Sequence, residues 1–175
     1  MHFSEIKYCD IANGPGVRVS LFVSGCTRHC KDCFNEVAWD FEYGPEFSKN
    51  IQDYIIEFLN KSYIDGLTIL GGEPMEPKNQ KGVSEFLKRV REEAPKANIW
   101  LFSGYELDKD IQPEDGRVHT EYTDDILKNI DMLVDGPFIA EKKNISLKFR
   151  GSENQRIIKM PATLREGKIV LWEDM

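Results

Sequence analysis

Short apolar runs alternate with amphipathic segments along most of the chain. A weakly alternating run predicts a short edge strand at 3–8, and nearly all-apolar runs predict strands at 18–23, 67–70, 98–102 and 132–134. Between these runs, apolar residues recur at helical spacing, which predicts helices over 49–61, 79–93 and 124–130. We expect Ser48 and Thr123 to cap the first and third helices, and Pro95 to end the second.

This alternation of strands and helices is typical of a parallel sheet covered by helices. Two weaker strands are expected near the carboxyl end, at 156–160 and 168–172. A closed eight-fold barrel normally needs about 250 residues, and this chain has 175. The prediction is therefore a single α/β domain over residues 1–175, built as a partial (β/α) barrel or an open, mostly parallel sheet.

Each predicted inner strand ends at an unusual loop. These loops are residues 26–33, which we call the cysteine loop, and residues 71–74, 103–105 and 135–137. Ligands of α/β folds bind at the carboxyl ends of the strands, so we expect the four loops to share one rim. Arg18 on its strand and Asp135 at a strand end are further candidates to line the pocket.

Composition limits the compartment, the cysteine chemistry and the partners that this site can have. The chain has no basic-then-apolar leader and no apolar run of membrane-spanning length, so we expect a cytoplasmic protein without a membrane partner. In that compartment, four cysteines favour metal or redox chemistry over disulfides. The net charge of −7 argues against nucleic-acid binding. Residues 142–168, however, carry eight Lys or Arg against two Glu, and could contact an acidic partner.

The cysteine loop carries three thiols, Cys26, Cys30 and Cys33, in a C-x3-C-x2-C pattern. Three close cysteines favour an iron–sulfur cluster with one iron left open to a ligand. A zinc site completed by His29 or Cys9 stays open, as does a reactive thiol cluster. We interpret His29 as a solvated spacer and Cys9 as a buried structural thiol.

The second constellation is Gly71, Gly72, Glu73 and Pro74 at a strand end. Glycines allow the backbone to approach a ligand closely, and a carboxylate can hold a cationic amine. The alternative is an ordinary glycine turn that Pro74 ends. A three-cysteine loop expected on the same rim favours the ligand interpretation.

Together, the cysteine loop and the Gly-Gly-Glu-Pro loop resemble the radical S-adenosylmethionine superfamily. The resemblance implies a [4Fe-4S] cluster on Cys26, Cys30 and Cys33, whose open iron chelates the methionine group of S-adenosylmethionine. It implies reductive cleavage of that cofactor to a 5′-deoxyadenosyl radical, with no protein side chain as general acid or base. The cofactor-binding residues would be Asp32, Cys33, Phe34, Gly71, Gly72, Glu73 and Pro74. Asp32 stands where many members have an aromatic residue, so Phe34 is the candidate adenine contact.

A closer resemblance is to the glycyl-radical-enzyme activases of anaerobic ribonucleotide reductase. It rests on residues 13–18, 25–35, 71–74, 103–105, 135–138 and 150–156, with Trp39. It implies an enzyme whose radical abstracts hydrogen from a glycine of the large reductase subunit, supplied with electrons by a low-potential donor such as flavodoxin. Residues 142–168 would then be a docking surface. Alternatives are another small radical enzyme, acting on pyruvate formate-lyase or in modified-nucleoside synthesis, and a zinc-binding interaction module.

Overall fold

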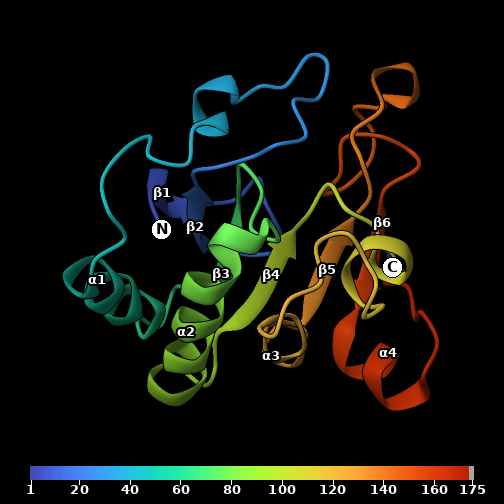
Figure 1. Cartoon of the computed structure of the whole chain (residues 1–175). Coiled ribbons are helices and arrows are strands. Elements are labelled where there is room, and N and C mark those ends of the chain that lie inside the picture. Colours follow the sequence, from blue (N-terminus) through green and yellow to red (C-terminus); the bar gives the residue numbers. More distant parts are fainter. Residues whose placement is uncertain (174–175) are drawn as a thin grey trace.

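The computed structural model describes residues 1–173 as a six-stranded mixed sheet with helices (Figure 1). The strands lie in sequence order: β1 (Phe3–Asp10), β2 (Arg18–Val23), β3 (Gly66–Gly71), β4 (Asn98–Phe102), β5 (Met132–Asp135) and β6 (Arg156–Lys159). Strands β2 to β5 are parallel, and β1 and β6 pair antiparallel at the two edges. The sheet is not closed into a barrel, which confirms the prediction of an open, mostly parallel α/β sheet.

Four helices accompany the sheet: α1 (Lys49–Leu59), α2 (Pro77–Glu93), α3 (Thr123–Lys128) and α4 (Met160–Glu166). Three short helical turns lie in the connecting segments: η1 (Glu36–Trp39), η2 (Leu107–Ile111, one π turn) and η3 (Ala140–Lys142). Ser48 caps α1 as expected, because its side chain accepts from the backbone N–H of Ile51. The expected cap at Thr123 is wrong: Tyr122 is the N-cap, and the Thr123 hydroxyl instead donates to Gln80 at 2.7 Å.

The carboxyl end differs most from the prediction. Helix α4 was not anticipated; it has a proline in its first turn and ends at Gly167 in the left-handed region, with φ 68°. Residues 168–172 do not form a strand in the described chain, since only an isolated bridge joins Leu171 to Ile158. Backbone bonds from Trp172 to Ile157 and from Lys159 to Val170 hold this segment beside β6.

The two faces of the sheet bury different clusters. On β4, Ile99 and Leu101 join the main core, which also contains the buried faces of α1, α2 and α3. Trp100 and Phe102, between them, belong to a second apolar cluster. Successive side chains of a strand point to opposite faces, so one face packs against helices. The other face is left for loops and for the site described below.

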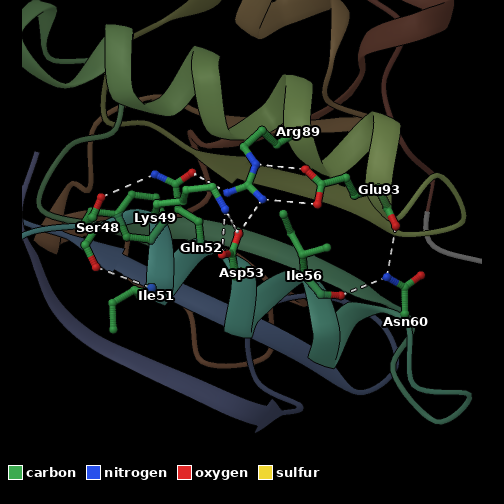
Figure 2. A network of polar contacts seen from close by, with 10 residues as sticks. Ser48, Lys49, Ile51, Gln52, Asp53, Ile56, Asn60, Arg89 and Glu93 are labelled. Atoms are coloured by element: carbon green, nitrogen blue, oxygen red, sulfur yellow. Dashed lines mark hydrogen bonds and ion pairs between the residues drawn. The ribbon is translucent and has the colours of Figure 1, made fainter.

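A polar network ties α1 to α2 on the outside of the helical layer, as Figure 2 shows. The Arg89 guanidinium donates to Asp53 at 2.6 Å, to Gln52 at 3.1 Å and to Glu93 at 2.9 Å. Asn60 donates to the backbone oxygens of Ile56 and Glu93. These bonds join α1 to α2, and none of the residues in the network lines the cavity described below. None of the helices within residues 1–173 has the length and apolar character needed to cross a bilayer.

Candidate functional site

A cavity of about 550 Å³ opens where the parallel strands end, on the face of the sheet that carries Leu70 and Phe102. Cysteine-loop residues line it, together with residues from three later loops. The lining residues used below are Cys26, Arg28, Cys30, Asp32, Cys33, Phe34, Gly71, Gly72, Glu73, Ser103, Gly104, Gly136 and Phe138. The expected rim therefore forms, and loops far apart in sequence meet at one cavity.

Backbone hydrogen bonds anchor the root of the cysteine loop. The N–H of Gly25 donates to Ala38 at 2.7 Å, and the N–H of Glu73 donates to the carbonyl of Gly25 at 2.9 Å. Gly25 itself has φ 104°, which favours glycine. At Gly72, a Cβ atom would lie 2.7 Å from the Gly25 oxygen. The Gly-Gly-Glu-Pro loop can therefore press against the cysteine loop only because glycine stands at this position.

The three loop cysteines differ in burial. Cys26 is buried, Cys30 and Cys33 are half-buried, and all are free thiols. Burial raises the pKa of the Cys26 thiol to about 11, against hydrogen bonds from the backbone of Arg28 and His29. Those backbone donors favour a thiolate, the form that binds metal. Among residues 1–173, no three His, Cys, Asp or Glu side chains are grouped closely enough to hold a metal ion in this conformation.

The chemistry of the donors nevertheless fits an iron–sulfur cluster. Three thiols from one loop face one cavity, and thiolates are the usual ligands of such clusters. His29 is exposed and stacks on Trp39 with ring centroids 4.2 Å apart, in keeping with its interpretation as a spacer. When a cluster is bound, Cys26, Cys30 and Cys33 would supply three ligands and leave one position for another molecule.

Glu73 is the central acidic group of the cavity and is 2% exposed. Its carboxylate accepts from the Ser103 hydroxyl at 2.8 Å and from the N–H groups of Gly104 at 2.7 Å and Met75 at 2.9 Å. Burial raises the pKa of Glu73 to about 7, although these three donors and the charge of Arg28 oppose the increase. A carboxylate offers about four lone-pair sites. Glu73 therefore keeps acceptor capacity for a cationic ligand.

Two residues at the start of α2, Glu76 and Asn79, also position the site, and the sequence analysis missed both. Glu76 accepts from the Thr27 N–H at 2.8 Å, from the Thr27 hydroxyl at 2.7 Å and from the Tyr105 hydroxyl at 3.2 Å. The Asn79 amide donates to the backbone oxygens of Ser24 and Glu73. In the sequence, the available signal was a second acid three residues after Glu73. Its role was not predictable, because its partners Thr27 and Tyr105 lie about 50 and 30 positions away.

Several expectations about single residues need correction. Cys9 was expected to be buried, but it is exposed, because it lies on the outward face of the edge strand β1. Pro74 is buried and is not one of the lining residues. Asp32 and Phe34 do line the cavity; Phe34 is 83% exposed and Asp32 has φ 60°. The structure thus places most of the predicted cofactor residues together.

Arg18 and Asp135 were expected to line the pocket, and neither does so. Arg18 is at the opposite end of β2 from the cysteine loop, where it donates to Thr68 at 2.8 Å and to backbone oxygens of neighbouring strands. Asp135 is fully buried and accepts from the Leu107 N–H and from Arg156. Both residues support loops that border the cavity.

Arg28 and Tyr105 form a stack beside Glu73. The Arg28 guanidinium lies 4.8 Å from the centre of the Tyr105 ring, and Arg117 lies 4.7 Å from the same ring. Arg28 lines the cavity, whereas Arg117 does not. The Nε atom of Arg28 is buried without a hydrogen-bond partner among the described residues.

Comparison with known proteins agrees with this geometry. A family model described as a 4Fe-4S single cluster domain matches residues 12–158. The anaerobic ribonucleoside-triphosphate reductase-activating protein of Enterobacteria phage T4 is 37% identical over 159 residues, covering 90% of this chain and 93% of the relative. The proteins of the same name from Vibrio cholerae and Escherichia coli K12 are 39% and 38% identical, with coverage of 90% and 89% of this chain and 97% and 96% of theirs.

An open α/β sheet that carries three cysteines and a Gly-Gly-Glu-Pro loop at one rim defines an iron–sulfur protein of the radical S-adenosylmethionine type. Within that class, the chain belongs to the family of anaerobic ribonucleoside-triphosphate reductase-activating proteins.

Proposed function

We propose that this single-domain protein is the enzyme that installs a glycyl radical on an anaerobic ribonucleoside-triphosphate reductase. Its two cofactors would be a [4Fe-4S] cluster and S-adenosylmethionine. The observation that carries the proposal is the meeting of Cys26, Cys30 and Cys33 with Glu73 at one cavity. The names of the relatives support the choice of reductase as the target.

When bound, the cluster would supply one electron that cleaves the sulfonium of S-adenosylmethionine, and the resulting 5′-deoxyadenosyl radical would take hydrogen from a reductase glycine. The protein binds, orients and shields these groups. The Glu73 carboxylate, which Ser103 and Gly104 hold in place, would receive the ammonium group of the cofactor. Phe34 offers an exposed ring beside the third cysteine for contact with the adenine.

The partner would approach over the cavity mouth, where residues from 142–168 lie. Lys142 and Lys143 are exposed and suit an acidic surface of the reductase. Arg156 is a poor probe of docking, because it pairs with buried Asp135 and with Asp108. A low-potential donor such as flavodoxin is the class of protein that would reduce the cluster.

The test uses anaerobically reconstituted protein with Cys33→Ser and Cys9→Ser as matched variants. Wild type and Cys9→Ser should be brown, hold about four irons each, and release 5′-deoxyadenosine from S-adenosylmethionine under reducing conditions. Cys33→Ser should lose the cluster and this activity. With the reductase present, a glycyl-radical doublet should appear in the electron paramagnetic resonance spectrum.

Two outcomes would contradict the proposal in different ways. Colourless protein with stoichiometric zinc would leave an interaction module instead of a radical enzyme. Cofactor cleavage without a radical on the reductase would keep the class of enzyme and reject the target, and pyruvate formate-lyase or a small heterocycle would be tried next.

A further inference from the structure

Arg28 makes no ion pair in the described chain, although its charge acts on nearby Glu73. The ion pairs of residues 1–173 do not include it. Its Nε atom is buried, and no hydrogen-bond partner for it lies within the described part of the chain. Leaving a charged donor unsatisfied costs free energy that a bound anion would recover. The guanidinium borders the cavity, so the anion would have to come from there.

The position of Arg28 depends on the loop after β4. A Cβ atom at Gly104 would lie 2.6 Å from Arg28 Nε and 2.8 Å from its Cδ. The Arg28 side chain therefore fills the space that the missing Gly104 side chain leaves, and it rests on the Tyr105 ring. Such packing restricts a long side chain to one place before any ligand arrives, which lowers the entropy cost of binding.

Glu73 lies on the other side of the same glycine. The Gly104 N–H donates to the Glu73 carboxylate at 2.7 Å, while the Gly104 Cα faces Arg28. An acid and a base thus flank one residue without pairing with each other. Two opposite charges held apart at one cavity wall match the two charges of an amino-acid zwitterion.

The other cations near the cavity are less suited to this role. Arg150 already donates to the Gln155 carbonyl at 2.6 Å. Lys143 also lines the cavity, but its side chain is exposed, so water screens its charge. A planar guanidinium also binds a carboxylate through two parallel hydrogen bonds, which an ammonium does not.

We propose that Arg28 binds the α-carboxylate of the methionine group of S-adenosylmethionine, beside the ammonium site already assigned to Glu73. This inference rests on the proposed function and names the residue that sets recognition of the carboxylate. A carboxylate has two oxygens, so one that coordinates a metal through one oxygen still offers the other to a guanidinium.

The test measures equilibrium binding to cluster-loaded protein with the cluster oxidised, so that the cofactor is not consumed. The two ligands are S-adenosylmethionine and its decarboxylated analogue. Arg28→Met should weaken binding of S-adenosylmethionine roughly 10- to 100-fold and change binding of the analogue by less than about threefold. Arg28→Lys should recover part of the loss.

Arg117→Met is the matched control, because it removes the cation on the other face of the Tyr105 ring and does not border the cavity. It should change binding of both ligands by less than about threefold. Gly104→Ala is a second probe that leaves the cysteine loop intact and displaces the guanidinium. It should also weaken binding of S-adenosylmethionine more than binding of the analogue.

Equal losses for the two ligands in Arg28→Met, or a similar selective loss in Arg117→Met, would overturn the inference. If Arg28→Met holds less iron than wild type, the comparison passes to Gly104→Ala, and equal losses for the two ligands in that variant would overturn the inference. If cluster-loaded wild type binds no S-adenosylmethionine, the proposed function itself fails. Binding by wild type with unchanged selectivity in the variants would reject only the role of Arg28.

Discussion

The polar network between α1 and α2 and the polar network at the cavity rim use the same kinds of groups but differ in their exposure to water. In the first, Arg89 and its partners lie on the outer surface, with side chains of Asp53 and Glu93 more than 40% exposed (Figure 2). In the second, Glu73 and Glu76 are 2% and 4% exposed. Exposed pairs contribute little because water and salt compete with them, whereas buried groups depend on their protein partners.

The difference also separates stability from function. The outer network joins two helices through residues that do not line the cavity. The rim network joins the cysteine loop to loops after β3 and β4, so each of its bonds restricts where a ligand can lie. The predictions below test this contrast, from the largest expected effect to the smallest.

Glu76→Ala should lower the free energy of unfolding by about 3 kcal/mol, because it leaves the Thr27 N–H and hydroxyl and the Tyr105 hydroxyl without their acceptor. Iron loading should fall with it, since Thr27 belongs to the cysteine loop. Urea denaturation and iron analysis measure the two effects. Glu57→Ala, at an exposed position of α1, is the control and should stay within about 0.5 kcal/mol of wild type.

Glu73 should make the ligand-free protein less stable as the pH rises. The folded-state pKa of about 7 exceeds the ordinary glutamate value of 4.5. Stability from this group is therefore fully present below about pH 4.5 and is lost as the pH rises towards 7, by up to roughly 3 kcal/mol. Urea unfolding at several pH values should show a smaller decline in Glu73→Gln. An identical pH profile in the variant would contradict the assignment.

Arg89→Met should lower the free energy of unfolding by only about 1 kcal/mol, although it removes bonds to Asp53, Gln52 and Glu93. The methionine keeps the apolar contacts of the arginine stem, so the measured loss reports the charged head. Binding of S-adenosylmethionine should not change. A loss as large as that of Glu76→Ala would remove the contrast between the two networks.

Lys49→Ala should have the smallest effect, below about 0.5 kcal/mol, because the pair with Asp53 is an exposed i,i+4 contact. The difference from wild type should shrink further in 1 M salt, where the screening length is about 3 Å. Parallel denaturation curves at low and high salt provide the measurement.

Local pattern was enough to locate β1 to β6 and α1 to α3, because alternation and helical spacing reflect which side chains must leave water. It failed at α4 and at residues 168–172: the run from Ile169 to Trp172 is apolar and predicts a strand, but this segment takes its structure from backbone bonds and packing beside β6. It also failed for Cys9, since the number of neighbours on an edge strand is not a local property.

For the site, spacing identified Cys26, Cys30 and Cys33, and the glycine pair identified the loop that carries Glu73. The partners of that carboxylate were not predictable in the same way. Ser103 and Gly104 reach Glu73 only because β3 and β4 are neighbours in the sheet.

By itself, the sequence determined the order of the elements from β1 to β6, the three-thiol loop and the strand-end motif, all of which depend on residues close in the chain. Only the tertiary structure decided that Glu76 holds the cysteine loop, that Arg18 and Asp135 lie outside the cavity lining, and that Arg28 lies beside Gly104 without an ion pair among residues 1–173. Those placements depend on contacts between distant segments, whose free energies arise when the sheet brings the loops together.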